Sequence, residues 1–411
     1  MYWNCLAAAG ALIWAGIMLL PWRPWDTREF LDSSLTRSTA LSPAFEGEDE
    51  ERRSGSTLSE PRHLCRGVEG LASPEADLSD ITALIPARNE AEVVGMSLSS
   101  LQPQGFDLAI VLVDDRSTDG TAAVAQAAGG KDLRILSGEP LPAGWNGKVW
   151  ALEQGFRHVN TPLTLLIDAD IEFRPGIVSM LRQKLKENSL HFISLMPQMR
   201  MVSFWERLLM PAFVYFFKML YPFRLSNSGS LDVAAAAGGC ILLETRLIKE
   251  MDGFKAIRNE LIDDCALAKR VKSHGCKTWI GLTHSVHSLR SYKNLGGIWN
   301  MVARSAFCQL RYSAMLLAGM TVVISAVFWL PVVGLLFPAA SAKIISVGAF
   351  AAMILSYLPT LKFYRQPKGW ALALPLIATL YLAMTWSSAI RYWTGAGSPW
   401  KGRYYKRHEN A

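Results

Sequence analysis

The chain has 411 residues, with 42 Lys and Arg against 35 Asp and Glu, a formal net charge of +7 and a pI near 9.1. Hydrophobic residues make up 50% of it and the mean hydropathy is +0.17, which is high for a soluble protein. The polar part has no basic patch interleaved with aromatic residues, so nucleic acid is not an expected partner. Basic segments flanking a membrane explain the positive charge more simply.

Four charge-free apolar runs account for the excess hydrophobicity: 1–22, 313–342, 344–361 and 370–390. A helix needs about 20 apolar residues to cross a bilayer. The first run has no basic start and no small-residue cleavage site, so it is predicted to be an uncleaved transmembrane anchor rather than a signal peptide. The other three predict about three transmembrane helices within 313–392.

The flanking charges predict which side of the membrane each part faces. Arg23 and Arg28 follow the anchor, which places the polar bulk in the cytosol by the positive-inside rule. The basic tail, 393–411, also favours the cytosol, yet three full crossings would leave it outside. Either one apolar run is interfacial or re-entrant, or a crossing is miscounted.

The segment 23–79 is predicted to be a largely disordered linker, because its stretch EGEDEERRSGS combines mixed charge with low hydrophobicity. From Ile81 onward the sequence contains four strand-like apolar runs, ITALIPA, DLAIVLVDD, DLRILSG and LTLLIDADIEF. Segments with helical spacing separate them. Strands that alternate with helices in this way indicate βαβ units and a mostly parallel sheet. The α/β domain is predicted to span 80–312.

One stretch of this domain, 204–223, is strongly apolar but is interrupted by charged residues, Glu206, Arg207 and Lys218. This pattern favours an amphipathic helix that lies in the membrane interface. A helix buried within the domain is the alternative.

Two carboxylates end one of the buried strands. In LTLLIDADIEF, Asp168 and Asp170 follow the apolar run at alternate positions, which puts them on one side of an extended strand tip. Ligands of α/β sheets bind at the carboxyl ends of the strands. Paired carboxylates there suit a hard divalent cation that holds a diphosphate.

Other polar groups are expected at the same edge of the sheet. The loop after the first strand offers the backbone of Pro86 and Ala87 with the side chains of Arg88 and Glu90; the second strand ends at Asp114 and Asp115; a predicted helix starts beside Lys148. A lysine beside a helix N-terminus attracts phosphate oxygens. Together these groups predict a nucleoside diphosphate site with a metal. The phosphate-binding patterns of dinucleotide dehydrogenases and P-loop kinases are absent.

Later segments add candidates for the chemistry itself. Gly239, next to another glycine, allows close approach of the backbone to a ligand. Asp263 and Asp264 open a predicted helix, where one could act as general base and N-capping is the alternative role. Gln309 and Arg311 precede the first C-terminal apolar run, where a cation could stabilise a leaving diphosphate or simply flank the membrane.

The order of these motifs, PARNE, VDDRSTDGT, WNGKVWAL, IDAD, IDD and QLRY, resembles the membrane-associated family 2 glycosyltransferases. The resemblance covers 81–312 and the trailing apolar helices. It implies a GT-A fold, a mixed sheet flanked by helices, that binds a nucleotide-diphosphate sugar. It also implies that Asp114 and Asp115 lie at the base and ribose, with Lys148 near the diphosphate. Asp168 and Asp170 would hold Mg²⁺ or Mn²⁺.

The resemblance further implies an inverting single displacement with Asp264 as base. IDD stands in place of the commoner ED, which leaves both Asp263 and Asp264 open for that role. QLRY stands in place of QxxRW, which disfavours a processive polymer synthase. The details WNGKVWAL, IDDCALA, FCQLRYS and WKGRYY resemble the bacterial hopanoid-biosynthesis-associated branch, a relative of the ceramide glucosyltransferases.

The sequence therefore predicts a multi-pass enzyme of the bacterial inner membrane that transfers a sugar to a lipid, in hopanoid or glycolipid biosynthesis. A polyprenyl-phosphate sugar transferase is one alternative, since its acceptor needs no strong base. A nucleotidyltransferase is another. A non-catalytic membrane scaffold that retains a nucleotide-binding fold is the alternative outside enzymes.

Overall fold

The computed structural model describes residues 2–31, 76–396, 398–401 and 403–405. Most of the predicted disordered linker therefore lies outside the described residues. Its first residues are ordered, however: the Leu31 N–H donates to the carbonyl of Leu282 at 3.1 Å, and the Leu282 N–H donates to that of Glu29 at 2.8 Å. The chain is thus paired to the sheet immediately after the anchor.

The core of the polar part is an eight-stranded mixed sheet of order β3-β2-β1-β4-β7-β6-β8-β5. The strands are β1 (Ile81–Ala87), β2 (Ala109–Asp114), β3 (Leu133–Ser137), β4 (Leu163–Ile167), β5 (Ile171–Phe173), β6 (Phe192–Gln198), β7 (Cys240–Glu244) and β8 (Thr278–Ser288). β1 to β4 pair in parallel, whereas β7 is antiparallel to both β4 and β6. In the second half β6 and β8 pair in parallel, while β5 is antiparallel to β8. The predicted mixed α/β fold class is confirmed.

The parallel half forms because its central strands are uninterrupted apolar runs, which suit burial on both faces. All five residues of β4 are buried, as are six of the seven in β1. β1 pairs with both β2 and β4, so the carboxyl ends of these three strands meet at one edge.

Helices cover both faces of this sheet. In chain order they are α2 (Val94–Leu101), α3 (Thr121–Ala128), α4 (Gly147–Phe156), α5 (Ile177–Glu187), α8 (Thr245–Glu250) and α9 (Asp263–Ser273). Two separate apolar cores result, one under α2 and α5 and the other under α4, α8 and α9.

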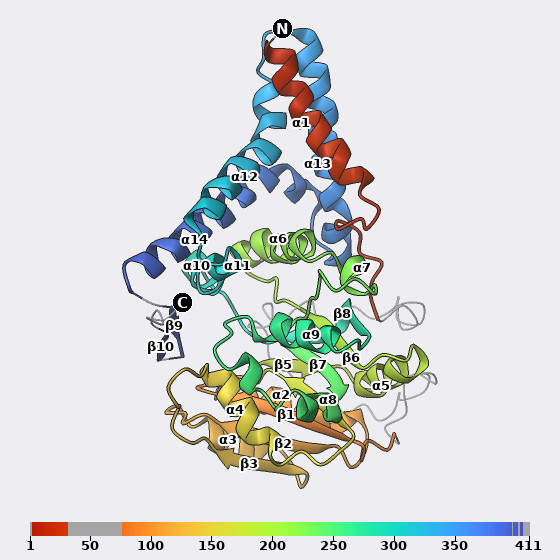
Figure 1. Cartoon of the computed structure of the whole chain (residues 1–411), viewed down its shortest axis with the longest axis vertical. Coiled ribbons are helices and arrows are strands. Elements are labelled where there is room, and N and C mark those ends of the chain that lie inside the picture. The colour runs from red at the N-terminus through yellow and green to blue at the C-terminus, as the bar shows by residue number, and fades with distance from the viewer. Residues whose placement is uncertain (1, 32–75, 397, 402, 406–411) are drawn as a thin grey trace, which may run out of the picture.

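Helix α6 (Phe204–Leu220) lies between the sheet and the apolar helices (Figure 1). Its start is fixed by a reciprocal capping box between Ser203 and Glu206. One side packs in a core with the apolar helices, where the Tyr215 hydroxyl and the Ser356 hydroxyl lie 2.8 Å apart. The other side packs against β6 and β8 through Val214. α6 is therefore covered on both sides by the rest of the chain.

Four helices of the described chain are long and apolar enough to cross a membrane. They are α1 (Tyr2–Leu19), α12 (Ala314–Gly334), α13 (Ala340–Phe363) and a segment that combines a 3₁₀ turn with α14 (Leu374–Trp393). The predicted break between two runs at Lys343 is wrong, because Lys343 lies in the first turn of α13 and the real break is at 335–339. One lysine near a helix end can extend its ammonium to the interface without ending the helix.

These helices differ in direction. α1 packs along α13 and α12, while α14 slants back towards the sheet domain and contacts α10 (Leu295–Ala303) and α6 (Figure 1). The tail that follows α14 touches the sheet domain, since the Lys401 carbonyl accepts a hydrogen bond from Arg88 at 3.0 Å. Tail and sheet domain therefore lie on the same side of the apolar helices.

Candidate functional site

The candidate site is built around Lys148, in the first turn of α4. Asn146 begins this helix, because its side-chain oxygen accepts the backbone N–H of Lys148 at 3.0 Å. The first turn of a helix carries partial positive charge, and the lysine adds a full one. The lysine ammonium lies beside Asp168, just after β4, and its predicted role at a diphosphate stays a prediction.

Lys148 joins carboxylates from two different elements. Its Nζ lies 2.8 Å from Oδ1 of Asp168, after β4, and 3.3 Å from Oδ2 of Asp263, at the start of α9. Burial lowers the pKa of Lys148, but the two carboxylates outweigh burial and raise it. Lys148 is therefore a fixed cation. For Asp168, burial raises the pKa in spite of the opposing effect of Lys148.

Asp264 is the second residue of α9, and its Oδ1 accepts the Cys265 N–H at 2.7 Å. Burial and the charge of Asp263 raise the pKa of Asp264 to about 6, although Lys148 opposes them. A carboxylate with a raised pKa is a stronger proton acceptor. Ile262 occupies the N-cap position, so neither aspartate is the N-cap of α9.

A small cavity of about 10 Å³ lies among these charged groups. The residues that line it include Pro86, Lys148, Asp168, Gly238, Asp263 and Asp264. A Cβ atom at Gly238 would lie 2.9 Å from Nζ of Lys148 and 3.4 Å from Oδ2 of Asp264. At Gly239 it would instead meet Pro197 at 2.6 Å. Gly238 therefore borders the charged cluster, whereas Gly239, the predicted donor-binding glycine, faces the core.

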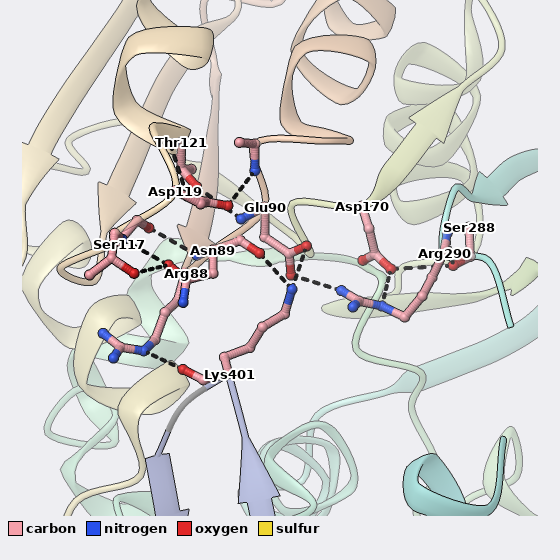
Figure 2. Close-up of polar contacts among 12 residues, drawn as sticks. Arg88, Asn89, Glu90, Ser117, Asp119, Thr121, Asp170, Ser288, Arg290 and Lys401 are labelled. Atoms are coloured by element: carbon pink, nitrogen blue, oxygen red, sulfur yellow. Dashed lines mark hydrogen bonds and ion pairs between the residues drawn. The ribbon is translucent and has the colours of Figure 1, made fainter. Parts of the chain in front are cut away.

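Asp170 has a different partner from Asp168. The chain turns at 169–170, so the two side chains leave an already bent strand tip rather than an extended one. Arg290, just beyond β8, donates from Nε to Oδ2 of Asp170 at 2.9 Å and from a terminal nitrogen to Glu90 at 2.7 Å (Figure 2). Arg290 is not among the site residues predicted from the sequence. Its position directly after a strand was the available signal.

A divalent cation fits the chemistry of the acidic pair. The contacts described above use Oδ1 of Asp168 and Oδ2 of Asp170, which leaves one oxygen of each carboxylate for a metal ion. Within the described ranges, no three His, Cys, Asp or Glu side chains are grouped to form an all-protein site. Mg²⁺ typically takes one or two carboxylates and completes its shell with water and substrate phosphates. The pair would therefore hold a metal together with a diphosphate.

The two predicted nucleotide loops are fastened to each other. The guanidinium of Arg88 donates to the carbonyls of Asp115 and Arg116. In the same loop, the side-chain oxygen of Asn89 accepts the Thr118 N–H at 2.9 Å. These bonds fix the ends of β1 and β2 relative to each other.

Within these loops, the side chains differ in their accessibility. Asp114 is partly exposed, and its Oδ1 accepts the Ser117 N–H at 3.3 Å. Asp115 is buried, with 2% of its surface exposed. Ala87 is buried as well, and its carbonyl accepts the Asp115 N–H at 2.8 Å. Asp114 is therefore the more accessible of the two aspartates.

The segment before α12 reaches the same site through a tyrosine. Gln309, the last residue of α11 (Ala306–Gln309), accepts a hydrogen bond from the Tyr221 hydroxyl at 2.5 Å. Burial raises the pKa of Tyr221, and the nearby Cys265 and Asp264 raise it further. Tyr221 thus bonds the membrane-proximal segment and lies close enough to the start of α9 to feel its charges, a position that the sequence did not suggest. Arg311 is exposed.

This arrangement has a counterpart among known families. Residues 82–252 match the family model described as glycosyl transferase family 2. This part of the chain is similar to the family 2 glycosyltransferases. The matched range includes Lys148, Asp168 and Asp170 but ends before α9. It covers less than half of the chain, and nothing in it concerns the hopanoid-associated branch, which stays a prediction.

Curated relatives match part of the chain. The 4,4'-diaponeurosporenoate glycosyltransferases of Staphylococcus aureus strains MRSA252 and USA300 are each 29% identical over 128 residues. Each alignment covers 31% of this chain and 34% of the relative. The chain thus spans about a third of the length of the curated relatives that it matches.

Solved structures resemble the chain more distantly. A mannosyltransferase from Pyrobaculum calidifontis, in complex with GDP-Man and Mn²⁺, is 17% identical with a TM-score of 0.46, over 79% of this chain and 90% of that one. The glucosyl-3-phosphoglycerate synthase of Mycobacterium tuberculosis, with Mn²⁺, UDP and glucosyl-3-phosphoglycerate, is 17% identical with a TM-score of 0.37, over 56% and 79%. Likenesses this distant carry no inference about activity.

Proposed function

We propose that this protein is an inverting, metal-dependent glycosyltransferase. It transfers a sugar from a nucleoside diphosphate to the hydroxyl of a lipid acceptor at the membrane surface. The observation that carries the proposal is the cluster of Lys148, Asp168 and the α9 aspartates at the carboxyl edge of a family 2 domain. It combines a fixed cation, a metal-binding pair and a basic carboxylate within one site.

The geometry divides the roles of the two α9 aspartates. Both line the cavity, but Asp263 is paired with Lys148, whereas Oδ2 of Asp264 lies beside Gly238. With a pKa raised to about 6, Asp264 is a base that is ionised near neutral pH. We therefore assign the proton transfer to Asp264 and the positioning of Lys148 to Asp263.

In the proposed reaction the acceptor oxygen bonds to the anomeric carbon as the bond from that carbon to the diphosphate oxygen breaks. Asp264 takes the proton of the acceptor hydroxyl. Lys148 and the N-terminus of α4 stabilise the negative charge of the departing diphosphate. A metal ion held by Asp168 and Asp170 would supply a further Lewis acid to that diphosphate.

A lipid acceptor is supported by what surrounds the base. Tyr221 bonds Gln309, in the segment immediately before α12, and lies close enough to Asp264 to interact with its charge. Helix α6 joins the sheet domain to the apolar helices. An acceptor hydroxyl at the headgroup level of a bilayer would therefore lie near Asp264.

We also propose a topology for the bacterial inner membrane, with the catalytic domain in the cytosol. Because the tail touches the sheet domain, the chain from α12 to α14 must make an even number of crossings. α12 and α13 supply two. We assign α14 to the interface, as its contacts with α10, α11 and α6 favour, and this resolves the conflict over the basic tail.

The decisive test uses detergent-purified protein, Mn²⁺ or Mg²⁺, a panel of nucleotide sugars, and total bacterial lipid extract. Release of nucleoside diphosphate that needs the lipid, together with a lipid whose mass rises by one sugar residue, would support the proposal and identify both substrates. Nucleotide binding without transfer to any lipid would favour the scaffold alternative. Release of pyrophosphate would instead indicate a nucleotidyltransferase.

A further inference from the structure

The C-terminal hairpin, composed of β9 (Ser398–Trp400), Lys401 and β10 (Arg403–Tyr405), lies against the loop that follows β1. Nζ of Lys401 donates to the carbonyl of Asn89 at 2.7 Å and lies 2.9 Å from Oε2 of Glu90. The Arg88 guanidinium donates back to the carbonyl of Lys401 at 3.0 Å (Figure 2). These contacts join segments more than 300 residues apart in the sequence.

From Lys401 a chain of alternating charges runs into the proposed donor site. Glu90 binds Lys401 through Oε2 and Arg290 through Oε1, and Arg290 in turn binds Asp170 at 2.9 Å (Figure 2). Both carboxylates are largely buried, with 11% of each side chain exposed. Buried ion pairs of this kind depend strongly on one another, since removal of one charge leaves its partner uncompensated.

We propose that Lys401 is a positioning residue of the donor site, an inference that rests on the proposed function. It acts through Glu90 and Arg290 on Asp170, one of the two proposed metal ligands. Without the ammonium group, both oxygens of Glu90 compete for Arg290 and draw it away from Asp170. The carboxylate then loses the contact that orients it towards a metal-bound diphosphate.

Lys401 also holds the conformation of the nucleotide loop. Asn89 has a positive φ of 51°, a left-handed conformation that costs free energy for any residue with a side chain. Its carbonyl is bonded by Lys401, and its side chain bonds the second nucleotide loop at Thr118. Through Lys401 the hairpin therefore holds the loops after β1 and β2 in place. We expect the affinity for the donor to fall when this contact is lost.

The test compares full-length wild-type protein with Lys401→Met, which keeps the length of the side chain and removes its charge. Lys401→Arg restores the charge, and Lys368→Met is a matched control at an exposed lysine. Calorimetric titration with UDP and with GDP, each with Mn²⁺, gives the affinity, and steady-state rates give KM and kcat. Loss of charge-assisted hydrogen bonds of this kind should weaken nucleotide binding and raise the donor KM roughly tenfold, with kcat changed by less than about twofold.

Lys401→Arg should recover most of the affinity, and Lys368→Met should match wild type. Unaltered nucleotide binding by Lys401→Met would overturn the inference and leave the proposed function standing. Equal losses of nucleotide affinity in Lys401→Met and Lys401→Arg, with a lowered thermal midpoint, would also overturn the inference. They would indicate that Lys401 only stabilises the fold. Failure of the wild-type protein to bind either nucleotide overturns the proposed donor chemistry itself, which the wild-type titration alone reveals.

Discussion

Replacement of Asp264 by asparagine, with Asp263→Asn as its matched control, separates the two carboxylates that open α9. Each substitution keeps the size of the side chain and removes its negative charge. Both aspartates line the cavity, but Asp263 lies 3.3 Å from Nζ of Lys148, whereas Oδ2 of Asp264 lies beside Gly238. If Asp264 is the base, the two variants should fail in different ways.

The expected magnitudes follow from the site. A pKa of about 6 for Asp264 means that wild-type activity depends on the deprotonated form and is lost as the pH falls through that value. About nine-tenths of the carboxyl is ionised at pH ~7 and about one-tenth at pH ~5, so the rate should fall roughly tenfold between them. Asp264→Asn removes a general base and should lower kcat by roughly 10²- to 10⁴-fold.

Asp263→Asn should behave differently. It leaves the base in place and removes a neighbouring charge that raises the pKa of Asp264. The acid limb of the rate profile should therefore move to lower pH. The donor KM should rise because Lys148 loses one of its two ion pairs.

The assay is the initial rate of nucleoside diphosphate release as a function of pH from ~4.5 to ~8, which spans the titration of the proposed base. Thermal midpoints of both variants control for misfolding. Wild-type rates in Asp264→Asn would refute the assignment and favour a phosphate acceptor, which needs no base. An acid limb that stays in place in Asp263→Asn would show that Asp264 does not titrate under its influence.

Three further outcomes are expected. Lys148→Met should weaken nucleoside diphosphate binding at least roughly tenfold and lower the free energy of unfolding by about 2 kcal/mol, because two carboxylates lose their cation. Calorimetry measures the binding and denaturant melts measure the stability. Binding equal to that of the wild type would contradict the role of Lys148. Asp168→Ala and Asp170→Ala should each abolish the dependence of nucleotide binding on Mn²⁺, and metal-dependent binding that persists in both would exclude the proposed metal site. Gly238→Ala should raise the donor KM because its Cβ would displace the ammonium of Lys148, whereas Gly229→Ala, with open space around its Cβ, should not.

The sequence alone was enough to predict the α/β class, the strand ends that carry Asp114 and Asp168, and the helix start at Lys148. These features are local, because apolar runs of strand length and capping side chains specify strands and helix starts from a few neighbouring residues. The apolar helices at both ends of the chain could also be predicted, since crossing a bilayer demands a long uninterrupted apolar stretch. Among these apolar helices, the predicted boundary at Lys343 was wrong, because that residue lies within α13.

The tertiary structure decided which charges meet. Lys148 pairs with both Asp168 and Asp263, and Arg290 joins Asp170 to Glu90, although these partners are far apart in the chain. Strand order determines which charges meet, and β7 enters the sheet between β4 and β6, and β8 between β6 and β5. No local pattern encodes that order, because pairing depends on packing over the whole sheet.

The same holds for the tail. Its composition indicated the side of the membrane, but its contact with the loop after β1 depends on how α14 turns back from the apolar helices. A lysine at the end of a chain has no sequence signal for a partner more than 300 residues away. The residues that could serve the chemistry were therefore predictable from local pattern, whereas their assembly into one site required the fold, because long-range packing alone brings those charges within bonding distance.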